Sequence, residues 1–205
     1  MDYYLSSTGW IRKQVTVDGR PLPKRALREY ASDFQPILEE LRQEDDEPTH
    51  FEALTAVAIR HFAESDVDFA ILEVGIGGQY DATSAVNPVA SAVTSISLEH
   101  TELLGETRAE IARDKAHVAP KSRPLVTGAT GTALEAIKDE TEVISVSQSH
   151  SEADVTVTYG GLVNETECLI RMTSGGSDLE AELQLLGEHQ AQNAGVGCER
   201  RRSVG

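Results

Sequence analysis

The chain has 205 residues, enough for one large domain with its own core or for one domain with a small addition. Its 34 Asp and Glu outnumber 18 Lys and Arg, which gives a net charge of −16 with histidine neutral. So acidic a chain is neither a general nucleic-acid binder nor a polybasic membrane-contacting protein, because both need an excess of Lys and Arg.

The distribution of the charged residues indicates adaptation to high salt. The basic residues are 13 Arg and 5 Lys, and the acids are spread along the chain. A diffuse excess of carboxylates fits work at high salt, where a Debye length of roughly 3 Å at 1 M screens self-repulsion. An ordinary acidic protein is the alternative. The sequence shows no apolar run near the roughly 18 residues of a membrane span, no signal peptide, and no metal pattern around Cys168 or Cys198. We expect a cytoplasmic protein.

The first 65 residues predict a short strand with a turn and then two helices. Residues 15–23 predict a strand and a turn. Apolar residues at steps of three and four over 27–41 predict a helix, and Pro36 inside it predicts a kink or two helices. After an acidic break at 44–48, a second helix is expected with Thr49 as its N-cap.

The next part of the chain alternates continuous apolar runs with helical patterns. The expected elements are strands at 69–72 and 89–96, a helix at 107–118, a strand at 124–127, a helix at 131–139 and a strand at 143–146. Continuous apolar strands separated by helices indicate a parallel sheet covered on both faces. The fold class is therefore α/β, with a doubly wound parallel sheet and flanking helices.

After about residue 150 the apolar period becomes two. Three alternating segments, divided by Gly160-Gly161 and Gly175-Gly176 as turn residues, predict a small antiparallel meander, and a last helix is expected from near Glu188. We expect one incomplete domain over 1–196, followed by an aberrant basic tail at 197–205. Its parts are the α/β region at about 12–150, the meander at about 151–187 and the start of a closing helix at 188–196.

Glu73 is the sharpest local candidate for a functional residue. It stands at the expected carboxyl end of a buried parallel strand, where open α/β sheets bind ligands and where an unpaired carboxylate is costly. Gly75, Gly77 and Gly78 follow and let backbone approach a ligand closely. The stretch reads G-x-G-G and is a poor dinucleotide fingerprint. A glycine turn beside a solvated Glu is the alternative.

His100 and Lys115 are the next candidates. His100 follows the second apolar strand, so it is expected at the same sheet edge as Glu73, where the two could share a divalent cation with water and phosphate oxygens. A capping or hydrogen-bonded loop residue is the alternative. Lys115 is one of only 5 lysines and lies inside a helix near these loops, although an exposed lysine is the commoner outcome.

Several ordered motifs together resemble the folylpolyglutamate synthase and dihydrofolate synthase family of the Mur ligase superfamily. Their spacings match as well, over roughly residues 12–194. The motifs are Phe51-Glu52-Ala53-Leu54-Thr55, Leu72-Glu73-Val74-Gly75-Ile76-Gly77-Gly78, Asp81-Ala82-Thr83, Thr94-Ser95-Ile96-Ser97-Leu98-Glu99-His100-Thr101 and Ile111-Ala112-Arg113-Asp114-Lys115-Ala116. The resemblance implies the central ATP-binding domain of a Mur ligase, a parallel sheet with flanking helices plus a small β meander.

The resemblance also implies an activity and its residues. The family uses ATP and Mg²⁺ to convert a pteroate or folate carboxylate to an acyl phosphate, which the amino group of glutamate attacks. By resemblance, Glu73 and His100 are magnesium ligands, and Lys115 is a lysine that becomes carbamylated and helps hold the metal. The pterin substrate would contact Thr49, His50, Phe51, Glu52, Tyr80, Asp81 and Ala82. Asn193 would contact the nucleotide, with His189 and Gln190 in the same motif.

The chain also departs from the family pattern. The Gly-rich phosphate loop of the form T-N-G-K-G-S, whose amides and Lys cradle phosphates, does not occur in this sequence. By the resemblance we also expect the family's C-terminal domain to be missing, and three arginines at 200–202 suggest a frameshifted ending; a genuine basic tail is the alternative. We expect no ligase turnover from this chain alone. Two alternatives stay open. The chain is a truncated remnant with metal or pterin affinity, or it is one piece of a split ligase that a separately encoded fragment completes. The choice between dihydropteroate and folate as substrate also stays open.

Overall fold

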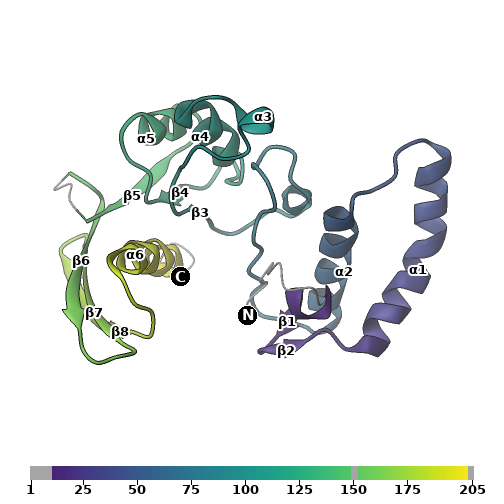
Figure 1. Ribbon diagram of the computed structural model, residues 1–205, viewed down its shortest axis with the longest axis horizontal. Coiled ribbons are helices and arrows are strands. Elements are labelled where there is room, and N and C mark those ends of the chain that lie inside the picture. Colours follow the sequence, from purple (N-terminus) through teal and green to yellow (C-terminus); the bar gives the residue numbers. More distant parts are fainter. Residues whose placement is uncertain (1–10, 149–151, 203–205) are drawn as a thin grey trace. The chain divides into compact units, whose positions relative to one another are not determined.

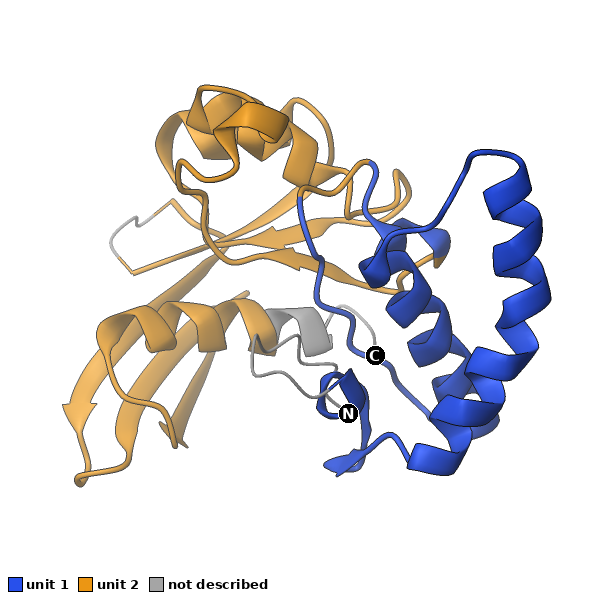
Figure 2. Cartoon of the chain, turned by 45° about the vertical axis from the view of Figure 1, so that its right-hand side comes forward, with its two compact units in different colours: residues 1–76, 80–85 blue, residues 77–79, 86–205 orange. Residues whose placement is uncertain are grey.

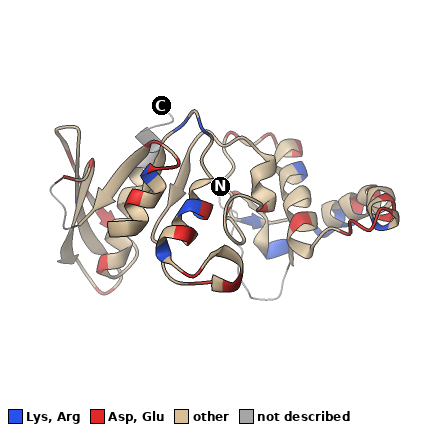
Figure 3. Cartoon of the chain, turned by 90° about the horizontal axis from the view of Figure 1, so that it is seen from above, with Lys and Arg blue, Asp and Glu red and all other residues tan. Residues whose placement is uncertain are grey.

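The computed structural model describes residues 11–148 and 152–202, with side chains as far as Cys198. The chain divides into two compact units (Figure 2). Unit 1 comprises residues 1–76 and 80–85, and unit 2 comprises residues 77–79 and 86–205. Acidic residues are spread along the elements of both units (Figure 3), as the diffuse distribution in the sequence predicts. None of the described helices is long and apolar enough to cross a membrane.

Unit 1 is a small helical body. Its elements are η1 (Ile11–Gln14), β1 (Thr16–Val17), β2 (Arg20–Pro21), α1 (Lys24–Gln43), α2 (His50–Glu64) and η2 (Ala82–Ala85). β1 and β2 form a hairpin through Asp18 and Gly19, which both have positive φ (50° and 72°), where a single short strand and a turn were expected. Asp-Gly favours such a turn because both residues tolerate the left-handed region. The core consists of Val15, Leu22, Tyr30, Leu54, Val57, Ala58 and Phe62.

The helix containing Pro36 is continuous. α1 runs unbroken from Lys24 to Gln43, so of the two predicted outcomes at Pro36, a kink or two helices, the division into two helices is wrong. Proline removes only one backbone donor, and the remaining turns are sustained by neighbouring residues. Pro36 itself is exposed, so it does not contribute to the core.

The start of α2 agrees with the sequence. Thr49 Oγ1 accepts a hydrogen bond from the Glu52 backbone N–H at 3.2 Å, and Glu52 Oε2 accepts one from the Thr49 N–H at 2.7 Å. This reciprocal capping box satisfies two donors that a helix start leaves without intrahelical partners. The predicted N-cap is therefore confirmed.

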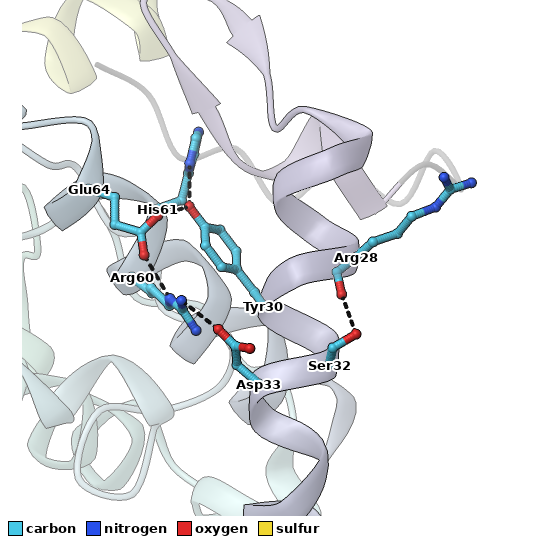
Figure 4. Close-up of polar contacts among 7 residues, drawn as sticks. All are labelled: Arg28, Tyr30, Ser32, Asp33, Arg60, His61 and Glu64. Carbon is cyan, nitrogen blue, oxygen red and sulfur yellow. Dashed lines mark hydrogen bonds and ion pairs between the residues drawn. The ribbon is translucent and has the colours of Figure 1, made fainter.

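A polar network joins α1 to α2 (Figure 4). The buried Tyr30 hydroxyl donates to Glu64 Oε2 at 2.8 Å and lies 3.3 Å from Nδ1 of His61. Arg60 bonds to Glu64 at 2.9 Å and to Asp33 at 2.7 Å. Its guanidinium also stands 4.6 Å from the centre of the Tyr30 ring, a cation–π distance. The network therefore adds polar links to the apolar packing between the two helices.

Unit 2 is built on one six-stranded sheet. The strands, in the order in which they pair, are β3 (Ser91–Val93), β4 (Leu125–Thr127), β5 (Val143–Ser147), β6 (Val155–Leu162), β7 (Cys168–Ser174) and β8 (Ser177–Leu183). β3 to β6 pair in parallel and β6 to β8 are antiparallel. The expected fold class is confirmed. The meander continues the parallel sheet because β6 pairs directly with β5.

Helices cover both faces of this sheet. The helices are α3 (Thr101–Leu104), α4 (Arg108–Ala116), α5 (Gly131–Lys138) and α6 (Glu188–Arg202). Leu125 belongs to the core beneath α4 and α5, whereas its neighbour Val126 belongs to the core beneath α6. Successive strand residues point to opposite faces, so α6 covers the face opposite α4 and α5 (Figure 1).

The closing helix packs closely on the sheet. A Cβ at Gly195 would overlap the Val157 side chain and lie 3.0 Å from Cγ1 of Val146, so only glycine allows α6 this approach. α6 extends to Arg202, through the first residues of the segment predicted as a basic tail. Residues 203–205 of that segment, and residues 1–10 of the predicted domain, lie outside the described residues.

Two local expectations differ from the structure. In the run at 69–72, only Ile71 has strand character, as an isolated bridge, and Phe69 is 63% exposed. The run therefore lacks the burial on both faces that the prediction assumed. Gly160 and Gly161 lie inside β6 at a register shift, while Gly175 and Gly176 form the turn between β7 and β8. A glycine pair inside a strand pattern is also compatible with a bulge.

Candidate functional site

A hollow of about 390 Å³ lies in unit 1 against α2. Its lining residues are Glu52, Thr55, Ala56, Ile59, Tyr80, Asp81, Ala82, Ser84 and Ala85. Glu52, Tyr80, Asp81 and Ala82 are four of the seven residues predicted to contact substrate. The structure therefore brings together two motifs that stand about 30 residues apart in the sequence.

The other three predicted substrate residues stand at the start of α2. Thr49 is the N-cap, and His50 is the exposed first residue of the helix. The Phe51 ring packs beside Gly75, where a Cβ would lie 3.0 Å from ring atom Cε1. Phe51 therefore supports the glycine segment.

Asp81 shapes the loop that it stands in. It is 7% exposed, and its Oδ2 accepts hydrogen bonds from the backbone N–H groups of Gly75 at 2.9 Å and Ile76 at 3.1 Å. Its Oδ1 accepts from the backbone N–H of Thr83 at 2.9 Å and from the Thr83 hydroxyl at 2.6 Å. A carboxylate has about four acceptor sites, so the Asp81 side chain is fully occupied by the protein itself.

Glu52 is also engaged, though at the surface. The hydrogen bond from the Thr49 backbone N–H lowers the pKa of its carboxyl, with the Thr49 side chain contributing next. Glu52 is therefore ionised at neutral pH and adds a negative charge to the first turn of α2, where the helix dipole favours it.

Thr55 is a lining residue that sequence reasoning missed. It is 3% exposed, and its Oγ1 has no hydrogen-bond partner among the described residues. A buried hydroxyl usually has a partner. Nothing in the sequence distinguishes this threonine from an ordinary helical residue, because the missing partner is visible only once all of its neighbours are placed.

A second candidate cluster lies in unit 2 around Lys115. The Lys115 ammonium lies 3.1 Å from Oε1 of Glu99, and the Lys115 side chain is only 19% exposed. His100 adjoins Glu99 in the sequence and is exposed. Lys115 is thus a partly buried, ion-paired lysine, and the commoner alternative of a freely solvated lysine is wrong. Its partner Glu99 was not predicted.

His100 has an unusual backbone conformation. Its φ of 48° lies in the left-handed region, where the three other non-glycine residues of the described chain are aspartates. Its carbonyl oxygen accepts from the backbone N–H groups of Leu103 and Leu104, both at 2.9 Å. His100 therefore occupies the N-cap position of α3 through its backbone, and its side chain makes no capping hydrogen bond. Sparsely populated conformations of this kind cluster at functional sites, so the capping role is compatible with a ligand role.

Gly77 and Gly78 let the chain lie directly on α4. A Cβ at Gly77 would overlap Oδ1 of Asp114, and one at Gly78 would stand 2.7 Å from the Asp114 carbonyl oxygen. The glycine segment therefore packs against the turn of α4 that carries Lys115. The Oδ1 atom of Asp114 is itself buried without a hydrogen-bond partner in the described part of the chain.

Glu73 precedes this segment and is exposed. It belongs to unit 1, whereas His100 and Lys115 belong to unit 2. Among the residues with described side chains, no three His, Cys, Asp or Glu groups converge as a ready metal site. The magnesium roles of Glu73 and His100 stay predictions.

The predicted nucleotide residues lie at the start of α6. His189 and Asn193 are exposed, and the Asn193 amide donates to Oε1 of Gln190 at 3.4 Å. Gln192, which the sequence did not single out, donates to the carbonyl oxygen of Gly128 at 2.7 Å. This bond anchors the first turn of α6 to the carboxyl end of β4, the ligand-binding edge of a parallel sheet.

Comparison with known proteins identifies the class. The family model of the Mur ligase middle domain matches residues 34–198, so the chain belongs to the Mur ligase middle-domain family. Its relatives within that family are folylpolyglutamate synthases. It is 50% identical over 198 residues to a probable bifunctional folylpolyglutamate synthase/dihydropteroate synthase of Haloferax volcanii, covering 95% of this chain and 24% of the relative.

Two further comparisons agree. The chain is 34% identical over 188 residues to a dihydrofolate synthase/folylpolyglutamate synthase of Bacillus subtilis, covering 90% of this chain and 44% of that one. A solved FPGS–AMPPCP–folate complex matches with a TM-score of 0.83 at 26% identity, over 94% of this chain and 48% of that one. The chain spans about a quarter to a half of these relatives' length. The predicted family is confirmed, and the predicted adaptation to salt fits the haloarchaeal relative.

Proposed function

We propose that the chain forms the substrate- and metal-binding middle part of a folate-pathway ligase that uses ATP to join glutamate to a pteroate or folate carboxylate. The observation that supports it best is the Lys115–Glu99 pair beside His100, in a chain similar to folylpolyglutamate synthases over nearly its whole length. A carboxylate resists attack by an amine. ATP converts it to an acyl phosphate, the amine of glutamate attacks the acyl carbon, and phosphate leaves as the amide forms.

The charges around Lys115 fit a magnesium site. Carbamylation, in which the neutral amine adds CO₂ and releases a proton, would replace the Lys115 cation with a carboxylate. That carboxylate would stand close to Glu99, now 3.1 Å from the Lys115 nitrogen, and two adjacent carboxylates are stable together only with a cation or proton between them. Oxygen ligands are those that Mg²⁺ prefers. Bound magnesium would neutralise phosphate oxygens.

The proposed ligands are Glu73, His100 and carbamylated Lys115. Glu99, the residue that the structure adds, would hold the lysine ammonium in place before carbamylation and oppose the reaction until the metal arrives. The proposed pterin contacts come from Thr49, His50, Phe51, Glu52, Tyr80, Asp81 and Ala82. Asn193, His189 and Gln190 would contact the nucleotide. For Asp81, its four accepted hydrogen bonds support a role in positioning the loop at Tyr80 rather than in direct side-chain contact.

Carbon-13 NMR of the chain in ¹³C-bicarbonate tests the proposal. We expect a carbamate signal that strengthens with MgCl₂ and AMPPCP, because the cation relieves repulsion between Glu99 and the new carboxylate. The signal should vanish in Lys115→Arg and persist in Lys121→Arg, a matched change at an exposed lysine. A spectrum without a carbamate in the presence of magnesium, or a signal that survives Lys115→Arg, contradicts the proposal.

Turnover belongs to the whole ligase in this proposal, since the chain spans 24% of its haloarchaeal relative. The split-ligase alternative adds a partner, a separately encoded segment that carries the phosphate loop. Glutamate-dependent ATP hydrolysis that appears only when such a segment is added would support the alternative, whereas turnover by the chain alone would exclude the need for it.

A further inference from the structure

The polar groups of the hollow against α2 differ in how far the protein already uses them. Asp81 accepts four hydrogen bonds from its own loop, and Glu52 closes the capping box. Tyr80 is 87% exposed. Thr55 is the exception, since its buried Oγ1 has no hydrogen-bond partner among the described residues. The protein therefore leaves one polar group unsatisfied in the lining of this hollow.

An unsatisfied buried hydroxyl is costly to the free protein. Thr55 lies on the face of α2 that lines the hollow, and threonine in a helix divides between two χ1 rotamers. Rotation about χ1 moves the hydroxyl between staggered positions without moving the helix, and contact with a ligand requires that one of them face the hollow. Apolar Ala56 and Ile59 on the same helix offer contact for a flat ring. The volume of about 390 Å³ lies in the ordinary range for small-molecule sites.

We propose that Thr55 is a specificity-determining residue whose hydroxyl hydrogen-bonds the polar edge of the heteroaromatic ring of a folate-class substrate. The inference rests on the proposed function, because the ring class follows from the folate assignment. A hydroxyl both donates and accepts, which suits a ring edge that carries both kinds of group. Binding then gives the Thr55 hydroxyl the hydrogen bond that it lacks in the free protein. A ring without a polar edge cannot form this bond and therefore binds less tightly.

Three variants test this reading. Thr55→Val keeps the shape of the side chain and removes the hydroxyl, whereas Thr55→Ser keeps the hydroxyl. Thr141→Val is the matched control, because Thr141 also has a buried, unpartnered Oγ1 and belongs to unit 2, outside the hollow. Folate affinity is measured by calorimetry at high salt, and thermal unfolding is measured without ligand.

We expect Thr55→Val to weaken folate binding roughly tenfold, the effect of one buried hydrogen bond, while Thr55→Ser and Thr141→Val stay within about twofold of the unsubstituted chain. Without ligand, Thr55→Val should unfold at the same or a higher temperature, because it loses an unsatisfied group. Equal folate affinity in Thr55→Val and the unsubstituted chain overturns the inference and leaves the proposed function standing. Lowered thermal stability in Thr55→Val alongside weaker binding also overturns it, in favour of a structural role. Absence of folate binding by the unsubstituted chain overturns both.

Discussion

Replacing Tyr30 with Phe removes the hydroxyl that links α1 to α2. The change deletes the 2.8 Å bond to Glu64 and leaves Nδ1 of His61, which is 3.3 Å away, without that partner (Figure 4). A hydrogen bond to a charged group contributes about 1.5–3 kcal/mol. Because the Glu64 side chain is half exposed, water can replace part of the hydrogen bonding that its carboxylate loses with Tyr30. We therefore expect Tyr30→Phe to lower the free energy of unfolding by about 2 kcal/mol at pH 8.

The same hydroxyl makes the difference depend on pH. Burial raises the pKa of Tyr30 to about 12, with the hydrogen bond to Glu64 adding to the effect. The unfolded chain ionises near the ordinary value of 10.0. A raised folded-state pKa gives stability that is fully present below pH 10 and is lost as the pH rises toward 12. The loss reaches about 1.4 kcal/mol at pH 11. Phe has no such group, so the cost of Tyr30→Phe should shrink to roughly 0.6 kcal/mol at pH 11.

Urea unfolding followed by circular dichroism at pH 8 to 11 in molar KCl measures this convergence. Ser32→Ala is the control on the same helix, since the exposed Ser32 hydroxyl donates only to the Arg28 carbonyl oxygen at 2.9 Å. It should change stability by less than about 0.5 kcal/mol at every pH. Parallel pH curves for the unsubstituted chain and Tyr30→Phe would refute the reasoning, because they would mean that Tyr30 ionises alike in both states.

Three further outcomes are expected. Burial lowers the pKa of His61 below 6.5, so stability should be fully present above pH 6.5 and fall as the pH drops through that folded-state pKa; acid titration of His61→Gln should flatten the curve. Gly195→Ala should lower the free energy of unfolding in urea by about 1–3 kcal/mol, because the added Cβ meets Val157. Gly197 has open space around it, so Gly197→Ala should raise the free energy of unfolding by up to about 1 kcal/mol. With a net charge of −16, the thermal midpoint should rise between 0.1 and 3 M KCl, and a flat response would speak against adaptation to salt.

The features that the sequence predicted well are those decided by nearby residues. The capping box of α2 acts between Thr49 and Glu52, three residues apart. The alternation along β6 and β7 needs only one buried face, which residues two apart record directly. Such signals survive any tertiary arrangement, and for that reason the helices and the meander could be placed before the structure was known.

The features that it predicted poorly depend on distant neighbours. An apolar run becomes a doubly covered strand only if other elements cover it, and the run at 69–72 leaves Phe69 63% exposed. The pairing of β5 with β6 is likewise a contact between segments, and it turned an expected separate meander into part of one sheet. Glu99 escaped notice for the same reason. It is 16 residues from Lys115, and only the packing of the loop on α4 makes them an ion pair.

The role of a polar residue follows from how many of its hydrogen bonds the protein itself supplies. Asp81 stands in a motif that suggests ligand contact, yet four donors of its own loop occupy both oxygens, so removing it should disturb the loop before it disturbs any ligand. Thr55 closes the mostly apolar motif Phe51–Thr55, and its Oγ1 has no hydrogen-bond partner within the described chain. The sequence predicted ligand contact for Asp81 and did not single out Thr55. The number of bonds left over separates them, because only the group with unused capacity gains free energy when a ligand enters the hollow.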